Sequence, residues 1–197
     1  MKINFFELGQ TPIDDDEKLA LIPHIDTLEE LNIWEHENII EARKWAMSSR
    51  VLKISDVFDL DFLVKLHKKM FNKTWKWAGN LRASNKNIGC DFYQIRTELK
   101  NLSDDIKFWL EKNTYNAKQL ALIIHHRLVK IHLFPNGNGR HARLAADCIL
   151  KKLDSTKKID WEGKNFRSSE ELRKKYITAL RSSDKGDYRE LFWIFEA

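Results

Sequence analysis

The sequence IHLFPNGNGRHAR, residues 131–143, interrupts the most apolar part of this chain of 197 residues. Residues 135–139 are Pro, Asn, Gly, Asn and Gly, a composition typical of turns and loops. His132 precedes the turn, His141 follows it, and two arginines are included in the stretch. Because apolar residues recur at helical spacing on both sides, the stretch is predicted to be a loop between two helices.

The two helices that flank this loop are predicted to be buried on most of their surface. Apolar residues of the first are Ala117, Leu120, Ala121, Ile124, Leu128 and Ile131 on one face and Leu122, Ile123 and Val129 on others; those of the second are Ala142, Ala145, Ala146, Ile149 and Leu153. A helix that is apolar on several faces has to be covered by neighbours on most sides. The flanking helices are therefore expected to form the centre of the domain.

The remaining segments add helices and one region without a helical period. Helices are predicted over residues 33–49, from Asp59 or Asp61 to Phe71, over 98–112, and within 169–196. Residues 1–32 are predicted to be an irregular lead-in. Residues 80–95, rich in Asn and Gly, are predicted to be a short hairpin or an extended flap. The predicted fold class is mostly α, with a buried central helix pair and a small β-hairpin flap.

Composition argues against a membrane protein and a disulfide-rich domain. No apolar run approaches the ~20 residues that span a bilayer, and no signal-peptide core is present, so the chain is expected to be cytoplasmic without a membrane partner. Cys90 and Cys148 are too few for a disulfide framework. His125 and His126 show no metal-ligand spacing and are expected to have core or supporting roles. A net charge of +5 permits nucleic-acid contact, but the basic clusters are scattered, so a nucleic-acid partner is disfavoured.

The loop itself has the residue types of an anion-binding site. Gly137 and Gly139 lack side chains, so backbone N–H groups can approach a ligand closely. The helix that begins here has first N–H groups without intrahelical partners, at the positive end of its dipole. Arg140 and Arg143 lie on neighbouring positions of one helical face, where their guanidinium groups could hold phosphate oxygens. His132 is the candidate general base, because its unperturbed pKa is about 6.5.

Each of these residues also has a plainer interpretation. Asn138 is a good helix N-cap, Arg140 and Arg143 could be surface charge, and a lone histidine such as His132 is more often structural than catalytic. The coincidence of a base, a Gly-Asn-Gly turn, a helix start and two arginines nevertheless favours a phosphate site. The stretch is not a Walker A loop, because it lacks the Gly-Lys-Ser/Thr ending.

The loop resembles the signature of the Fic family, His-x-Phe-x-Asp/Glu-Gly-Asn-Gly-Arg-x-x-Arg. The matching residues are His132, Phe134, Gly137, Asn138, Gly139, Arg140 and Arg143. WAGNLR, residues 77–82, is similar to the segment that leads into a Fic flap, and the mobile mystery protein B branch is the closest resemblance. The resemblance covers residues 60–155 best. It implies one domain over residues 1–197, with an N-terminal helical extension at 1–58, a Fic core at 59–155 and C-terminal helices at 156–197.

Fic proteins typically transfer AMP from ATP to a hydroxyl of a target protein. The resemblance implies that His132 deprotonates a Ser, Thr or Tyr hydroxyl, whose oxygen attacks the α-phosphate and releases pyrophosphate. Phe134 would anchor the loop in the core. A phosphotransferase variant of the wider Fic superfamily has Lys at the position that matches Gly139, so Gly139 favours nucleotidyl transfer.

The same resemblance assigns the binding roles. Phosphates would be held by Gly137, Asn138 with its amide as well as its backbone, and Gly139, with Arg140 and Arg143 on the β- and γ-phosphates. The flap, including Ile88, Gly89 and Tyr93, would dock a target segment by strand pairing. Rigid burial of the two helices would suit a reaction that depends on positioning.

Asn136 departs from the family signature, which has Asp or Glu at this position. That carboxylate normally helps to hold Mg²⁺ on the nucleotide phosphates, and a neutral amide oxygen binds Mg²⁺ with less charge. The expected cofactors are therefore ATP, as substrate, and weakly held Mg²⁺. The alternative functions are a catalytically weak nucleotide-binding regulatory module and, ranked last, a basic helical nucleic-acid-binding protein.

Glu37 is the candidate inhibitory residue. Many Fic proteins are inhibited by a helix with the pattern Ser/Thr-x-x-x-Glu-Gly/Asn, whose Glu pairs with the second arginine of the signature. Glu37 and Asn38 match its end, but Ile33 occupies the Ser/Thr position. The pattern predicts an ion pair between Glu37 and Arg143; a solvated Glu37 is the other interpretation, and a separate antitoxin-like partner is the other possible inhibitor.

Overall fold

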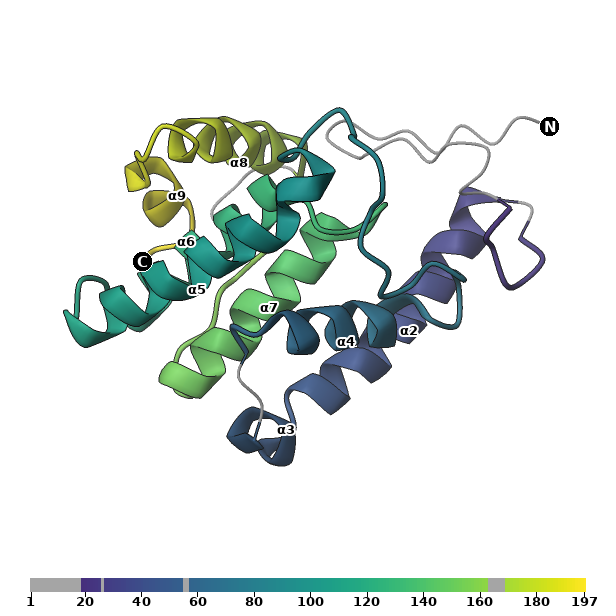
Figure 1. The fold of residues 1–197 in the computed structure, drawn as a ribbon, viewed down its shortest axis with the longest axis horizontal. Helices are drawn as coiled ribbons and strands as arrows, with labels where there is room; N and C mark the ends of the chain where they lie inside the picture. The colour runs from purple at the N-terminus through teal and green to yellow at the C-terminus, as the bar shows by residue number, and fades with distance from the viewer. Residues whose placement is uncertain (1–18, 26, 55–56, 163–168) are drawn as a thin grey trace.

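The computed structural model describes residues 19–25, 27–54, 57–162 and 169–197, and the regular elements within them are helices (Figure 1). In chain order they are α2 (Leu28–Ala46), α3 (Ser49–Ile54), α4 (Leu60–Phe71), the 3-10 helix η1 (Phe92–Gln94), α5 (Ile95–Glu111), α6 (Ala117–Ile131), α7 (Asn138–Leu153), α8 (Ser169–Ser183) and α9 (Arg189–Ile194). Leu21 and Trp75 form an isolated antiparallel bridge. The prediction of a mostly α fold is confirmed.

Helices α6 and α7 are the buried central pair that the sequence predicts. Five consecutive residues of α6, 120–124, are each at most 2% exposed. Helices α5 and α9 contact α6, while α3 and α4 contact α7. The pair therefore lies between α2 and α4 on one side and α8 and α9 on the other (Figure 1). Residues 132–137 join the two central helices, so both ends of this loop are fixed by buried helices.

Helix α2 begins five residues earlier than the predicted start at residue 33. Thr27 is its N-cap: the hydroxyl of Thr27 accepts from the N–H of Glu30 at 3.1 Å, and the carboxylate of Glu30 accepts from the N–H of Thr27 at 3.1 Å. This capping box satisfies two N–H groups that the helix start would otherwise leave without partners. The predicted irregular lead-in is therefore wrong for residues 28–32, and residues 1–18 lie outside the described ranges.

The other predicted helices form close to their predicted bounds. Helix α4 follows Asp59, whose carboxylate accepts from the N–H of Asp61 at 3.1 Å, and it ends at Phe71. Helix α6 follows Asn116, which makes a capping box with Gln119. Short polar side chains at these positions compete with water for the first N–H groups and so fix where each helix starts.

The segment before η1 differs from the predicted β-hairpin. In the described part of the chain, residues 80–91 contain bends and no strand. The side chain of Asn85 takes the place of a cross-strand ladder, since its amide donates to Asp91 at 2.8 Å and its oxygen accepts from the N–H of Phe92 at 2.9 Å. We call residues 84–91 the flap; it is an extended loop closed by side chains.

One hydrophobic cluster runs through the described ranges, from Ile25 to Phe195. Trp75, Phe71 and Phe134 are its largest fully buried side chains, and all three lie near the loop between α6 and α7. Of the helices that the structure describes, none is long and apolar enough to cross a membrane.

Candidate functional site

The loop between α6 and α7 is set by two residues in the left-handed backbone region. His132 follows the last turn of α6 with φ 58° and ψ 67°, and Gly137 precedes α7 with φ 76°. A Cβ on Gly137 would lie 2.6 Å from Cζ of Phe71, so both the conformation and the packing require glycine. A Cβ on Gly139 would meet no atom within 4 Å. The absent side chain at Gly139 therefore leaves open space at the start of α7, where a ligand can reach the backbone.

Phe134 and Asn138 hold the loop together from inside. Phe134 is fully buried, and its ring stacks on His67 with centroids 3.7 Å apart. The side chain of Asn138 accepts from the N–H of Phe134 at 2.9 Å and donates to its carbonyl at 2.8 Å. Phe134 thus anchors the loop in the core, as expected. Both polar atoms of the Asn138 amide bind Phe134, so the expected phosphate contact of this amide stays a prediction that would require these hydrogen bonds to open. Gly137 rather than Asn138 is the N-cap.

His132 is buried, with 3% of its surface exposed. Burial, and then the charge of Arg82, lower the pKa of His132 from its usual 6.5 to about 4, against a hydrogen bond to the backbone of Val129 that raises it. The imidazole is therefore neutral at about pH 7, which is the form that accepts a proton. The predicted base has the protonation state that the role requires.

Arg82 is a buried residue of the site that sequence reasoning missed. Its Nε donates to the carbonyl of His132 at 2.5 Å, and its Nη2 donates to the carbonyl of Ile131 at 3.3 Å. The same guanidinium donates to the carbonyls of Ser84, at 2.9 Å, and Cys90 in the flap. The stretch WAGNLR contained Arg82, but nothing in the sequence indicates which carbonyl groups it would meet.

His67 on α4 is a second missed residue. Its Nδ1 accepts from the N–H of Gly79 at 3.0 Å, so the proton lies on Nε2, which donates to the carbonyl of Asn136 at 3.1 Å. Burial holds the pKa of His67 well below its usual value, with a further contribution from His141. Neutral His67 thereby connects the loop to the segment that leads into the flap.

Arg140 is paired with a buried carboxylate on α2. Nη1 of Arg140 donates to Glu35, and the indole N–H of Trp75 donates to the other oxygen of Glu35 at 2.7 Å. Glu35 is 5% exposed, whereas the side chain of Arg140 is 40% exposed. The guanidinium carbon also lies 5.0 Å from the ring centroid of Phe71. The charge of Arg140 is therefore balanced within the protein.

Glu37 does not pair with Arg143, and this prediction is corrected. Glu35 and Glu37 are two residues apart on α2, which turns their side chains about 200° from each other. Glu37 is exposed and lines an open depression formed by α2 residues that include Asn32 and His36. The carboxylate that reaches the signature arginines comes from Glu35, and it binds the first arginine rather than the second.

Arg143 is surrounded by aromatic rings. Its guanidinium carbon lies 5.8 Å from the ring centroid of Trp161 and 5.4 Å from that of Tyr176 on α8. The hydroxyl of Tyr176 is hydrogen-bonded to Nε2 of His125 at 2.6 Å, and the indole N–H of Trp161 donates to Asp147 at 2.9 Å. Arg140 and Arg143 are neighbours in helical position, as expected, but their side chains contact different parts of the molecule.

Asn136 turns its side chain back on the loop. Its Oδ1 accepts from the N–H of Gly137 at 2.6 Å. Among the described residues there is no group of three or more His, Cys, Asp or Glu side chains that could hold a metal ion. The loop can therefore supply one neutral oxygen to a metal ion, provided that Oδ1 leaves the N–H of Gly137.

The predicted flap residues Ile88, Gly89 and Tyr93 are exposed, and Gly89 contacts His132. Ile88 and Tyr93 are 44% and 68% exposed, and Phe92 between them is 42% exposed. Gly89 has φ 108°, and a Cβ there would lie 2.7 Å from Cβ of His132. The structure thus brings the flap to the base, with its apolar side chains facing outward.

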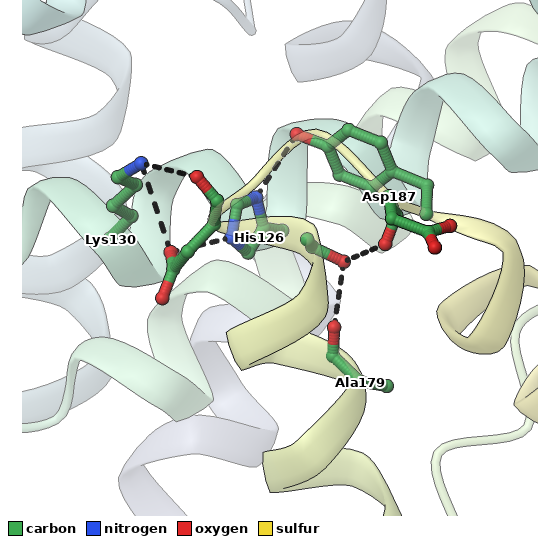
Figure 2. A network of polar contacts seen from close by, with 7 residues as sticks. His126, Lys130, Ala179 and Asp187 are labelled. Atoms are coloured by element: carbon green, nitrogen blue, oxygen red, sulfur yellow. Dashed lines mark hydrogen bonds and ion pairs between the residues drawn. The ribbon is translucent and has the colours of Figure 1, made fainter.

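His126 belongs to a separate polar network beneath α8 (Figure 2). Its Nδ1 contacts the hydroxyl of Tyr188 at 3.1 Å, and its Nε2 contacts Asp184 at 3.0 Å. Lys130 approaches the carboxylate of Asp184 at 3.8 Å. Together with the Tyr176 contact of His125, this confirms that both adjacent histidines have core or supporting roles.

Comparison with known proteins finds one matching family model and several similar proteins of known name. Residues 57–150 match the family model described as Fic/DOC family. The chain is 26% identical over 166 residues to protein adenylyltransferase fic-1 of Caenorhabditis elegans, covering 80% of this chain and 31% of that protein. It is 26% identical over 128 residues to protein adenylyltransferase Fic of Nematostella vectensis, covering 61% and 30%. The chain thus spans about a third of the length of these curated relatives.

Solved structures share the fold. Fic-1 of C. elegans superposes with a TM-score of 0.62 at 22% identity, covering 91% of this chain and 50% of that one. The BepC protein of Bartonella tribocorum, solved with bound AMPPNP, superposes with a TM-score of 0.64 at 19% identity, covering 93% and 97%. The helices outside residues 57–150 are therefore largely included in the shared architecture.

Proposed function

Because residues 57–150 of this chain belong to the Fic/DOC family, we propose that the chain is a protein adenylyltransferase. It transfers AMP from ATP to a Ser, Thr or Tyr hydroxyl of a target protein. The observation that carries this proposal is the neutral, buried imidazole of His132 beside a helix start left open at Gly139. The names of the relatives, which are adenylyltransferases, support the same reaction.

In the proposed reaction His132 accepts the proton of the target hydroxyl. The hydroxyl oxygen forms a bond to the α-phosphorus of ATP, the bond from that phosphorus to the bridging oxygen of the β-phosphate breaks, and pyrophosphate leaves with the electron pair. A base whose pKa is about 4 is fully deprotonated at neutral pH, so it is always ready to accept the proton. It is also a weak base, so most of the rate enhancement has to come from positioning and charge.

The phosphates are expected to occupy the start of α7. Backbone N–H groups of residues 137–139 lie at the positive end of the helix dipole, and Gly139 leaves room for phosphate oxygens. Burial raises the pKa of the nearby Asp147 carboxyl and Arg143 acts to lower it, but the direct ion pair of Asp147 is with Arg43, so the guanidinium of Arg143 can still bind phosphate. Arg140 can bind phosphate only in competition with Glu35. ATP binding therefore includes the cost of weakening the pair between Arg140 and Glu35.

Mg²⁺ is expected to arrive with ATP and to be held mainly by its phosphates. Mg²⁺ prefers charged, hard oxygen ligands, and Asn136 can offer only one neutral oxygen that already accepts from Gly137. When bound, the ion would neutralise phosphate charge. We expect Asn136→Asp to lower the Mg²⁺ concentration needed for half-maximal transfer; an unchanged metal titration would remove Asn136 from the metal site.

The flap is the proposed docking site for the target. Gly89 contacts His132, Ile88 and Tyr93 on either side of it in sequence are exposed, and the backbone of an extended loop can pair with an extended target segment. A separate antitoxin-like chain stays a prediction, and copurification from the native source would test it.

The first test is transfer of label from α-labelled ATP, with Mg²⁺, to proteins of a cell lysate. Wild type is compared with His132→Ala and with His36→Ala, which removes an exposed histidine on α2 as a matched control. We expect label with wild type and His36→Ala and none with His132→Ala. Label that survives His132→Ala would contradict the proposed role of His132.

A second candidate function is favoured by Asn136. A chain that binds ATP but transfers no label, even with Asn136→Asp, would be a nucleotide-binding regulatory module. Calorimetric titration with a non-hydrolysable ATP analogue separates this case from failure to bind nucleotide at all.

A further inference from the structure

The guanidinium of Arg82 joins two segments that are distant in sequence. On one side it holds the carbonyls of Ile131 and His132 at the end of α6. On the other side it holds the carbonyls of Ser84 and Cys90, close to the two ends of the flap. The backbone N–H of Arg82 also donates to the carbonyl of Leu133 at 3.0 Å. A residue that is 4% exposed thus fastens the flap to the backbone of the candidate base.

The flap and the base are in direct contact at Gly89. A Cβ at position 89 would lie 2.7 Å from Cβ of His132, 2.9 Å from Nη2 of Arg82 and 3.3 Å from the carbonyl of Ile131. Only a glycine permits this approach, and φ 108° also favours glycine. The position of the flap relative to His132 is therefore fixed by van der Waals contact as well as by Arg82.

We propose that Arg82 is a positioning residue that sets the register between a docked target segment and His132. This proposal rests on the proposed function, because it assumes that the flap docks the target. A target strand paired with the flap would have its hydroxyl presented to the imidazole at a distance that Arg82 determines. Arginine suits this role because its planar fork binds several carbonyl oxygens at fixed angles, which a lysine ammonium does not.

Arg82 also influences the charge state of His132. All of its hydrogen-bonded oxygens are neutral carbonyls, so no carboxylate bonded to it cancels its charge. Lys86 in the flap acts on the pKa of His132 in the same direction as Arg82, while Cys90 and Asp91 in the flap interact electrostatically with Arg82. One side chain therefore acts on both the geometry and the protonation of the base.

Three variants separate these two effects. Arg82→Lys keeps the positive charge but loses the planar guanidinium that binds several carbonyl groups. Arg82→Met removes both the charge and the guanidinium. Gly89→Ala keeps Arg82 and moves the flap away from His132. Arg96→Met, an exposed position at the start of α5, is the matched control for loss of one cation. Circular dichroism establishes which variants are folded, and Gly89→Ala, in an exposed loop, keeps the test available if Arg82→Met does not fold.

Hydrogen exchange and histidine NMR give readouts that need no activity. We expect the amides of residues 84–91 to exchange at least about tenfold faster in Arg82→Lys and Arg82→Met than in the control, since the flap loses its fastening. The pKa of His132 should stay near about 4 in Arg82→Lys and rise in Arg82→Met, remaining below 6.5 because burial persists. Unchanged exchange in both Arg82 variants would overturn the proposal.

Kinetics then connect the contact to transfer. With a defined target protein, Arg82→Lys and Gly89→Ala should raise the KM for the target about tenfold or more while KM for ATP changes little, because a shift of the docked hydroxyl is costly. An unaltered target KM in both variants would also overturn the proposal. Absence of transfer by wild type would instead contradict the proposed function and leave the exchange and NMR results to decide the role of Arg82.

Discussion

Arg140 and Arg143 lie three residues apart on α7, and the protein holds them in two different ways. Arg140 is bound to the carboxylate of Glu35, which is itself buried and hydrogen-bonded to Trp75. Arg143 lies against the rings of Trp161 and Tyr176, and its Nε is buried without a hydrogen-bond partner in the described structure. Arg140 thus forms a direct ion pair, whereas the carboxylate near Arg143, that of Asp147, is paired directly with Arg43.

This difference indicates separate tasks for the two arginines. Aromatic faces stabilise and orient a guanidinium without cancelling its charge, so Arg143 can attract an incoming anion. A buried carboxylate needs its counter-charge, so Arg140 stabilises the fold around Glu35 at least as much as it serves a ligand. Arg143 is therefore expected to dominate nucleotide binding, and Arg140 to dominate local stability.

The largest expected effect is a loss of stability in acid, because buried histidines lie near both arginines. Burial lowers the pKa of His141, which follows Arg140 in sequence, to about 4. Burial, with a smaller contribution from the charge of Arg143, lowers the pKa of His125 to about 3. Below about pH 6.5, the pKa of an unfolded histidine, the unfolded chain binds protons that the native chain does not bind. The free energy of unfolding is therefore highest above that pH and falls as the pH is lowered toward about 4, by on the order of 3 kcal/mol for each such histidine.

Urea unfolding between about pH 7 and about pH 4 measures this loss. His141 should titrate before His125 in any native population that remains, because its pKa is higher. A urea midpoint that stays constant across this range would contradict the burial of neutral histidines on either side.

The second prediction is that removing Arg143 mainly lowers ATP affinity, whereas removing Arg140 mainly lowers thermal stability. Arg143→Ala should weaken binding of an ATP analogue by about 10- to 100-fold, the value of a charge-assisted hydrogen-bond set, with little change in Tm. Arg140→Ala should weaken ATP binding only a few-fold, roughly 1 kcal/mol or less, yet lower Tm because Glu35 is left buried and unpaired. Calorimetry and thermal unfolding of both variants test this. Equal effects on affinity would remove the distinction.

The third prediction makes the two arginines more alike. Glu35→Gln keeps the hydrogen bond to Trp75 and removes the negative charge opposite Arg140, so ATP should bind several-fold more tightly, by about 1 kcal/mol. Glu37→Gln, two residues away and exposed, is the matched control and should change nothing. The gain should disappear in the Arg140→Ala background, and a gain that persists there would show that Glu35 acts by another route.

The smallest expected effect comes from the aromatic side. Tyr176→Phe retains the ring next to Arg143 and removes the hydroxyl, which contacts Nε2 of His125 at 2.6 Å and is also hydrogen-bonded to the side chain of Arg143. We expect about a two- to fivefold loss of ATP affinity, because most of the ring contact remains. A loss as large as that of Arg143→Ala would mean that the hydroxyl, not the ring, orients the arginine.

The contrast between Arg140 and Arg143 also shows which features the sequence could predict. The central helices and the loop could be predicted because they depend on local periodicity and on a short signature, whereas the role of His132 stays a prediction. The capping box at Thr27 is an equally local signal, and it starts α2 five residues before the position that apolar periodicity predicts. Local signals thus account for most of the helical framework.

The partners of the arginines were not predictable in the same way. Choosing between Glu35 and Glu37 depends on which face of α2 packs toward Trp75, and that contact joins residues 40 positions apart. Arg82 and His67 gain their roles only when burial brings backbone carbonyl groups to them. The flap failed as a hairpin because Asn85 closes it through a side chain, which strand propensity does not register.

The left-handed backbone of His132 implies a conflict between the stability of the loop and its proposed reaction. A helix that ends with φ 58° favours glycine at that position, and a side chain held there costs roughly 1 kcal/mol or more. His132→Gly is therefore expected to relieve this cost while removing the imidazole that the proposed reaction uses. Stability and the proposed reaction thus make opposite demands on the same position of the loop.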